Sequence, residues 1–308
     1  NILNSNLNLS EVVISKGLGP MVNAEKWHGI KNSVPMIDWV SEKDGKIDKV
    51  FKVFSVKADP IINHHRLGNT PIVPLVAYLE IGAETHSLIF GKGKQYCFKD
   101  VKIYRPLKLF NDKAQEIIMK IDEASDKSIN AVLYNYFKPK IGDGKMVEIA
   151  SMKISDKLSE YEYLNENTAI ETDGMKEMLL SESLERLSKI HNNAIQLGPL
   201  FMDDKSAKIN KYKYNDKGVV LTVALSEEQI RNKKYALPNL LFNPAFADTL
   251  MQSCGVHASE DSDRIYLPSE IGEFGLIKVP KEPGLFKSYA KLIKSSEEEK
   301  IYNVILYN

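Results

Sequence analysis

The sequence predicts an α+β protein made of two similar units, each a long buried helix laid against an antiparallel sheet. The first observation is a run at residues 75–90 that is apolar on nearly every side and stands between Pro74 and Gly91. A helix that is apolar all round is one that other structure wraps. The second observation is a series of short strand-like stretches after this helix, separated by turn residues. The third is that the second half of the chain repeats this order of elements.

The first unit begins after a polar lead-in at residues 1–30. Strand-period alternation starts at Lys49 and continues through residues 50–56, and Asp59-Pro60 then breaks it. The helix at 75–90 follows, and Gly91 and Gly93 end it. The strands predicted after the helix are residues 95–104, 116–122, 129–137 and 146–154.

The second unit is predicted to open with an amphipathic helix at residues 173–193. A second apolar helix starts at Pro244 and runs to about His257. The strands predicted around it are residues 206–214, 219–225, 264–267, 273–279, 286–293 and 300–306. A single long helix wrapped by an antiparallel sheet is the hotdog arrangement, so the two units together predict a double hotdog. The expected division is a linker at residues 1–30, a first hotdog at 31–165 and a second at 166–308, with the boundary in the polar stretch 157–172.

Composition excludes several classes of function. Of the 308 residues, 41 are Lys or Arg and 41 are Asp or Glu, so the net charge is zero and no electrostatic argument favours nucleic acid or an anionic membrane. No run reaches the roughly 18 apolar residues of a membrane helix. Cys97 and Cys254 form no Cys-x-x-Cys pair and are expected to be reduced in a cytoplasmic protein. The chain starts at Asn1, and we expect a piece of a longer polypeptide.

A histidine just before the first apolar helix is the first candidate for chemistry. A side chain with an ordinary pKa of about 6.5 suits a general base near neutral pH. Two neighbours compete for the role: counting back from Pro74 selects His65, whereas counting back from Gly68 selects His64. We prefer His65, because Pro74 marks the helix start. Backbone N–H groups at that start are suited to hold a carbonyl oxygen as charge builds on it.

An aspartate and a glutamine one turn apart on the second apolar helix are the other candidates. Asp248 and Gln252 share a face of the helix, among apolar neighbours. Burial raises the pKa of a carboxyl group, which keeps it protonated and able to donate. The competing interpretation, a helix cap or a solvated polar face, is weakened because Pro244 already marks the helix start.

A base and an acid from opposite halves suit removal of a proton next to a carbonyl together with protonation of a departing hydroxyl. No metal site is expected, because the histidines have no partners at ligand spacing. The run Gly91-Lys92-Gly93-Lys94 is interpreted as a helix stop rather than a phosphate loop.

These residues resemble the motifs of the dehydratase domains of modular polyketide synthases and related fatty-acid-type synthases. The matching segments run in order and at fitting spacings from about Val34 to the C-terminus. They are His65 through Pro74, Leu197-Gly198-Pro199-Leu200-Phe201, Asn243-Pro244 through Asp248 and Gln252, and Tyr266-Leu267-Pro268.

The resemblance implies dehydration of a β-hydroxyacyl thioester carried on the phosphopantetheine arm of an acyl carrier protein. His65 would remove the α-proton, Asp248 would protonate the leaving hydroxyl, and Gln252 would orient either Asp248 or the hydroxyl. No cofactor of the domain's own is implied. The implied partners are the carrier protein and neighbouring synthase domains, with a ketoreductase upstream and a second copy in a homodimer. The residues implied to contact the substrate are Gly68, Asn69, Pro74, Leu197, Gly198 and Phe201.

Three positions depart from the family pattern. Leu197 stands where the family has a tyrosine, Asn69 stands where it has a glycine, and Asn243 stands where it has a histidine. Neither acid nor base is removed, so rate and substrate orientation are affected more than reaction type. A double-bond isomerase or pyran-forming cyclase with the same base, and a catalytically silent structural domain, remain alternative interpretations. A free-standing hotdog thioesterase is less favoured, because it would not need two fused halves.

Overall fold

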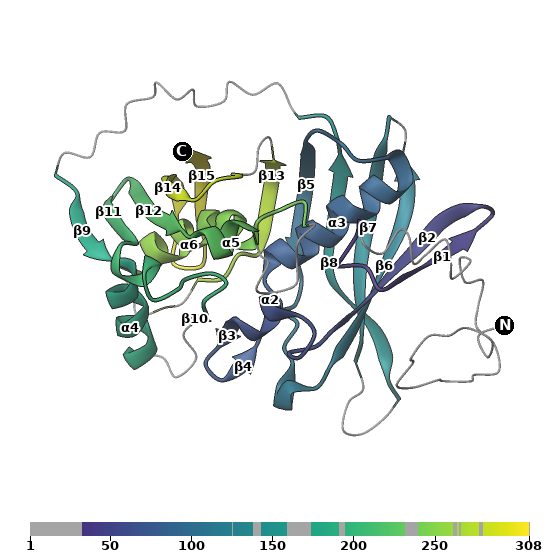
Figure 1. Cartoon of the computed structure of the whole chain (residues 1–308), viewed down its shortest axis with the longest axis horizontal. Coiled ribbons are helices and arrows are strands. Elements are labelled where there is room, and N and C mark those ends of the chain that lie inside the picture. Colours follow the sequence, from purple (N-terminus) through teal and green to yellow (C-terminus); the bar gives the residue numbers. More distant parts are fainter. Residues whose placement is uncertain are drawn as a thin grey trace.

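The computed structural model of the chain (Figure 1) describes residues 33–124, 126–137, 143–158, 174–190, 195–231, 240–260, 264, 266–276 and 280–307. The expected linker at 1–30 lies outside the described residues, as does the stretch 159–173 that holds most of the expected unit boundary. The division into domains therefore stays a prediction. Among the described residues no helix combines the length and the hydrophobicity that crossing a membrane requires.

The first unit is a seven-stranded antiparallel sheet laid against helix α3 (Leu75–Phe90), which has the predicted bounds. Gly91 ends α3 with a positive φ of 87°, a conformation that glycine adopts without strain. The sheet runs in the order β1 (Trp39–Lys43), β2 (Lys46–Phe54), β6 (Gln115–Ala124), β7 (Ser128–Phe137), β8 (Lys145–Ser155), β5 (Tyr96–Ile103) and β13 (Glu270–Leu276).

Helix α3 approaches this sheet closely at Gly82. A Cβ atom there would lie 3.0 Å from the sulfur of Met152 and 3.2 Å from carbons of Ile154 and Phe98. All twelve residues from Leu75 to His86 are buried. The helix is therefore enclosed on every side, as its apolar sequence predicts.

The second unit is a five-stranded antiparallel sheet packed against helix α6 (Pro244–Glu260). Its order is β15 (Lys300–Tyr307), β14 (Gly284–Ser295), β12 (Gly218–Leu225), β11 (Lys211–Asn215) and β9 (Lys176–Leu179). Helix α4 (Leu180–Ile190) follows β9, and α5 (Glu227–Arg231) follows β12. The predicted helix from Pro244 is confirmed and extends three residues beyond His257.

Several predicted elements of the second half are wrong. The described part of the expected helix 173–193 begins as strand β9, because residues 176–179 pair with β11. The expected strand 206–214 starts as a 3-10 turn at Ser206–Lys208, and only its later part is strand. Residues 264, 266 and 267 are not in a strand. Strand β13, expected beside its neighbours in the second half, pairs with β5 at the edge of the first sheet (Figure 1).

A small third sheet joins the two halves of the chain. Short helix α2 (Pro60–Asn63) leads into strand β3 (His65–Leu67), which pairs with β4 (Thr70–Pro71) on one side and β10 (Ile195–Leu197) on the other. The hydrophobic core around α3 also includes Phe242, Ala247 and Phe274 from the second half. The two units therefore share a packed interface, on which the predicted site residues lie.

Candidate active site

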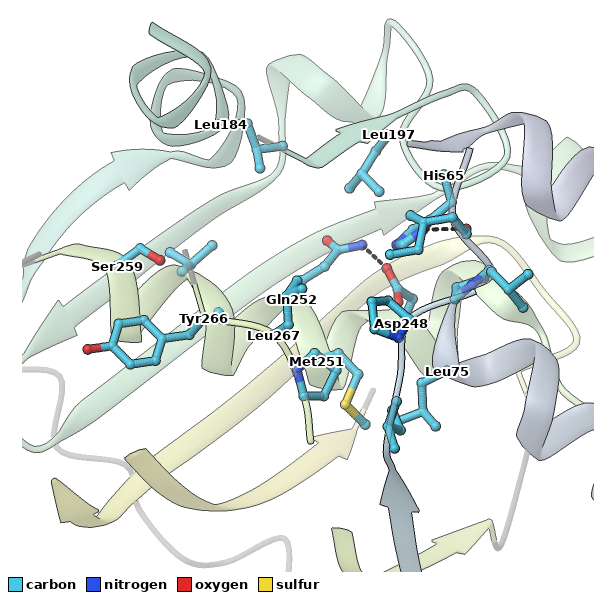
Figure 2. A pocket seen from close by; sticks show the side chains of 18 of the residues that line it. His65, Leu75, Leu184, Leu197, Asp248, Met251, Gln252, Ser259, Tyr266 and Leu267 are labelled. Carbon is cyan, nitrogen blue, oxygen red and sulfur yellow. Dashed lines mark hydrogen bonds between the residues drawn. The ribbon is translucent and has the colours of Figure 1, made fainter. Parts of the chain in front are cut away.

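A cavity of about 140 Å³ lies where the two units meet. Its walls come from β3, the start of α3, α4, α6 and residues 266–268. Both predicted catalytic groups, His65 and Asp248, line it, together with Gln252 (Figure 2). The fold thus brings together residues that are more than 180 positions apart in the sequence.

His65 is fixed in one orientation by its own hairpin. Strand β4 returns beside β3, and the Nδ1 atom of His65 lies 3.1 Å from the carbonyl oxygen of Ile72. A carbonyl oxygen can only accept, so Nδ1 carries the hydrogen in this contact, and Nε2 of the neutral ring keeps its lone pair. The ring of Phe201 packs against the imidazole with a centroid separation of 5.6 Å. His65 is 8% exposed, so the imidazole is largely shielded from bulk solvent.

Asp248 is carried by a helix with a well-defined start. Asn243 is the N-cap of α6, because its side-chain oxygen accepts the backbone N–H of Phe246 at 2.9 Å, and Pro244 occupies the first helical position. The side-chain nitrogen of Asn243 also donates to the carbonyl of Gln229 at 2.7 Å. Replacement of the family histidine by Asn243 therefore places a good capping residue under the helix that bears the carboxyl group.

The environment of Asp248 raises its pKa. Burial is the main cause, and the side chain is 5% exposed. Positive charge on His65 and the hydrogen bond from Gln252 act in the opposite direction, because both favour the charged carboxylate. The amide nitrogen of Gln252 donates to Asp248 Oδ2 at 2.8 Å, as drawn in Figure 2. One oxygen of the carboxyl group is thus held while burial favours its protonated form.

Two of the six residues expected to contact substrate line the cavity, namely Pro74 and Leu197. Pro74 is the N-cap of α3 and offers no side-chain cap, so the first N–H groups of that helix, at Leu75 and Val76, have no capping side chain. Leu197 pairs with His65 across β10 and β3 and presents an apolar side chain in Figure 2.

The other four of these residues are not among those that line the cavity, and their contact with substrate stays a prediction. Gly68 and Asn69 form the turn between β3 and β4, where Gly68 has a φ of 59° and the Asn69 carbonyl accepts from Arg66 at 2.9 Å. Phe201 supports the imidazole from the side. Gly198 leaves room for another ring, since a Cβ there would lie 2.9 Å from His64.

His64, the rival candidate for the base, has a structural position. Its carbonyl accepts the Gly198 N–H at 2.8 Å, and its Nδ1 accepts the Leu200 N–H at 3.2 Å. It is not among the residues that line the cavity. These bonds tie the loop after β10 to the residue before β3.

Sequence reasoning missed three contributions to the cavity. Leu180, Leu184 and Leu187 of α4 cover one side; their spacing of four and three residues signals one apolar helix face. Gly255 of α6 lines the wall, and apart from its chain neighbours and the nearby backbone of α6 no described atom lies within 4 Å of the position of an added Cβ. Tyr78 of α3 lines it as well, although its place in an apolar run predicts an ordinary core residue.

No group of three or more histidine, cysteine or acidic side chains in the described ranges is arranged to hold a metal ion. Neither Cys97 nor Cys254 is in a disulfide; Cys97 is buried and Cys254 half-buried. Burial raises the pKa of Cys254 to about 12.

Comparisons with known proteins agree with this fold. Residues 36–136 match the sequence family described as the polyketide synthase dehydratase domain. No curated protein sequence matches the chain.

Solved structures match nearly the whole chain. The dehydratase domain from the CurF module of curacin polyketide synthase is similar with a TM-score of 0.69 and 18% identity, over 90% of this chain and 94% of that one. The dehydratase domain of RzxB from Pseudomonas fluorescens has a TM-score of 0.66 and 12% identity, over 89% and 93%. A trans-AT dehydratase domain from Brevibacillus brevis has a TM-score of 0.67 and 12% identity, over 88% and 91%. The predicted resemblance is confirmed: the chain has the double-hotdog fold of polyketide synthase dehydratase domains, and residues 36–136 carry that family's sequence pattern.

Proposed function

We propose that the protein removes water from a β-hydroxyacyl thioester to give an α,β-unsaturated acyl thioester. The observation that carries this proposal is the meeting of His65 and Asp248 in one cavity. His65 has a ring nitrogen, Nε2, that can act as a base. Asp248 is a carboxyl group, and burial raises its pKa. Two titratable groups with such different environments suit paired general base and general acid catalysis.

The proposed reaction balances without any further reagent. Nε2 of His65 takes the α-proton, and the electrons of the broken C–H bond form the Cα–Cβ double bond. The Cβ–O bond breaks, and its oxygen takes the proton of Asp248 and departs as water. The site then holds an imidazolium and a carboxylate, and transfer of one proton from His65 to Asp248 restores the starting state. Gln252 keeps the carboxyl group oriented throughout by its bond to Oδ2.

The uncapped start of α3 supports the proposed position of the thioester carbonyl. Pro74 and Leu75 line the same cavity as His65, and the first N–H groups of a helix carry partial positive charge. As the α-proton leaves, negative charge builds on the carbonyl oxygen, and donors aimed at it stabilise that charge.

The family resemblance supports the proposed setting of the domain. The substrate would be held on the phosphopantetheine arm of an acyl carrier protein, so the domain would need no cofactor of its own. The neighbours would be other synthase domains, with a ketoreductase upstream supplying the β-hydroxyl. We further propose a cytoplasmic homodimer; size measurement by light scattering tests the dimer.

Variants of the two neighbouring histidines test the assignment of the base. His65→Phe is expected to lower the rate of water loss from a β-hydroxyacyl-loaded carrier protein by at least about 10²-fold, because it removes the base. Circular dichroism should show an unchanged fold, since Phe fills a similar volume. Asp248→Asn is expected to be similarly impaired. Full activity in His65→Phe, or loss of activity in His64→Phe alone, would show that His65 is not the base.

A further inference from the structure

The hydroxyl group of Tyr78 is a polar atom that the fold leaves without a partner. Tyr78 is 1% exposed, and its oxygen has no hydrogen-bond partner in the part of the chain that the structure describes. Buried hydroxyl groups in native proteins are almost always paired, so such an atom calls for an explanation. Tyr78 lines the same cavity as His65 and Asp248, but its oxygen is enclosed by the cavity wall, so a small shift of the phenol toward a bound ligand would supply the missing partner.

Tyr78 carries a neutral phenol that is able to donate a hydrogen bond. Burial raises the pKa of its phenol, so the group stays protonated throughout the physiological range. It stands on α3 one turn after Leu75, and helical side chains lean toward the N-terminus of their helix. The phenol therefore belongs to the cavity wall that also holds the uncapped start of α3.

The substrate has two polar groups near the reacting carbons, the β-hydroxyl and the thioester carbonyl. We expect each group to be bound by a residue from a different unit. The β-hydroxyl needs the acid, Asp248, which comes from the second unit. The carbonyl carbon is bonded to the carbon that loses its proton to His65, which comes from the first unit, as does Tyr78. The turn at Gly68 and Asn69, two of the residues implied to contact the substrate, is not among the lining residues.

We propose that the Tyr78 hydroxyl donates a hydrogen bond to the thioester carbonyl oxygen and stabilises the negative charge that develops there. This inference deepens the proposed dehydration and depends on it. It makes Tyr78 a catalytic residue, and it assigns the substrate a carbonyl group next to the carbon that is deprotonated.

The test is Tyr78→Phe, which removes only the oxygen. With a β-hydroxyacyl carrier substrate we expect kcat to fall about 10²-fold, the usual effect of losing one donor to a developing oxyanion. A wild-type protein that releases no water would refute the proposed function itself. A wild type that is active together with an equally active Tyr78→Phe would refute only the role of Tyr78.

Two non-reactive ligands distinguish the carbonyl from the hydroxyl as the partner. One is a β-hydroxyacyl amide of pantetheine, which keeps the carbonyl, and the other is the matching thioether, which lacks it. By calorimetry, Tyr78→Phe should weaken binding of the amide about 3- to 10-fold, the range expected for one neutral hydrogen bond, and leave binding of the thioether unchanged. Equal weakening of both ligands would overturn the assignment to the carbonyl.

Stability in the absence of substrate separates a ligand-binding hydroxyl from a structural one. Tyr212 is a matched control, because it is equally buried but its hydroxyl donates to Glu260. Urea unfolding should show a lowered midpoint for Tyr212→Phe and an unchanged or raised midpoint for Tyr78→Phe. A midpoint lowered as much by Tyr78→Phe would show that the fold itself uses this hydroxyl and would overturn the proposal.

Discussion

Glu80 links the first unit to the helix that carries Asp248. Its two carboxyl oxygens accept the backbone N–H groups of Leu241 at 2.6 Å and Phe242 at 2.7 Å, directly before the start of α6. Glu80 is 2% exposed, and burial raises its pKa to about 8, against the opposing effect of these hydrogen bonds and of the bond with Glu84. At neutral pH the folded protein therefore binds a proton at Glu80 that the unfolded chain, with an ordinary glutamate pKa near 4.5, has released.

Glu80→Gln separates two opposing effects on the free energy of unfolding. Glutamine has one acceptor oxygen in place of two, so one buried N–H loses its acceptor, which destabilises the fold by about 1–3 kcal/mol. The substitution also removes the cost of protonating a carboxyl group on folding. That cost grows by about 1.4 kcal/mol for each pH unit above the unfolded pKa until the folded pKa is reached. It is below about 1 kcal/mol at pH 5 and on the order of 5 kcal/mol at pH 8.

The expected result is a change of sign with pH. Glu80→Gln should be less stable than the wild type at pH 5 and as stable or more stable at pH 8, because the wild type loses stability as pH rises toward 8. Urea unfolding followed by circular dichroism at several pH values measures this, with the exposed Glu297→Gln as a control. A difference between Glu80→Gln and wild type that stays constant from pH 5 to pH 8 would refute the reasoning.

Two further predictions concern the cavity wall on α6. In Gln252→Leu the pKa of Asp248 should rise further, because the lost hydrogen bond favoured the charged form. The high-pH limb of the activity profile, which requires protonated Asp248, should then move upward in pH, and an unmoved or lowered limb would contradict this. Gly255→Leu should place its side chain in the cavity and abolish turnover of long acyl chains while sparing short ones. Gly272→Ala, at an exposed glycine with equally open surroundings, should leave the chain-length profile unchanged, and a chain-length-independent effect of Gly255→Leu would contradict the cavity assignment.

The sequence was sufficient to predict the bounds of an element where a helix-starting residue and a helix-ending residue stand at its two ends. Helix α3 has the predicted bounds because Pro74 fixes its start and Gly91 its end. The predicted amphipathic helix at 173–193 was wrong at its start, because residues 176–179 form a strand through pairing with β11, more than 30 residues away. Strand β13 likewise joins the first sheet through pairing with β5, a contact that a pattern along the chain does not encode.

For the site, the sequence predicts which side chains are chemically suitable but not which of them face the cavity. Residue type and spacing selected His65, Asp248 and Gln252 as candidates, since a base or an acid is recognisable from its side chain, and all three line the cavity. A contiguous motif does not reveal which of its members face the cavity: Leu197 lines it, whereas Gly198 accommodates the ring of His64. Tyr78 was missed because its phenol is indistinguishable from an ordinary core side chain until the burial of its oxygen is known.

The most direct test of the central claim is incubation of the purified chain with a carrier protein loaded with a β-hydroxyacyl group, followed by mass analysis of the carrier. The account predicts that the loaded carrier loses the mass of one water molecule, and that His65→Phe and Asp248→Asn prevent this loss. An unchanged mass with altered retention would indicate an isomerase or a cyclase instead. A carrier left unchanged in mass and retention, with a range of chain lengths and both hydroxyl configurations, would contradict the claim that His65 and Asp248 form a working dehydratase site.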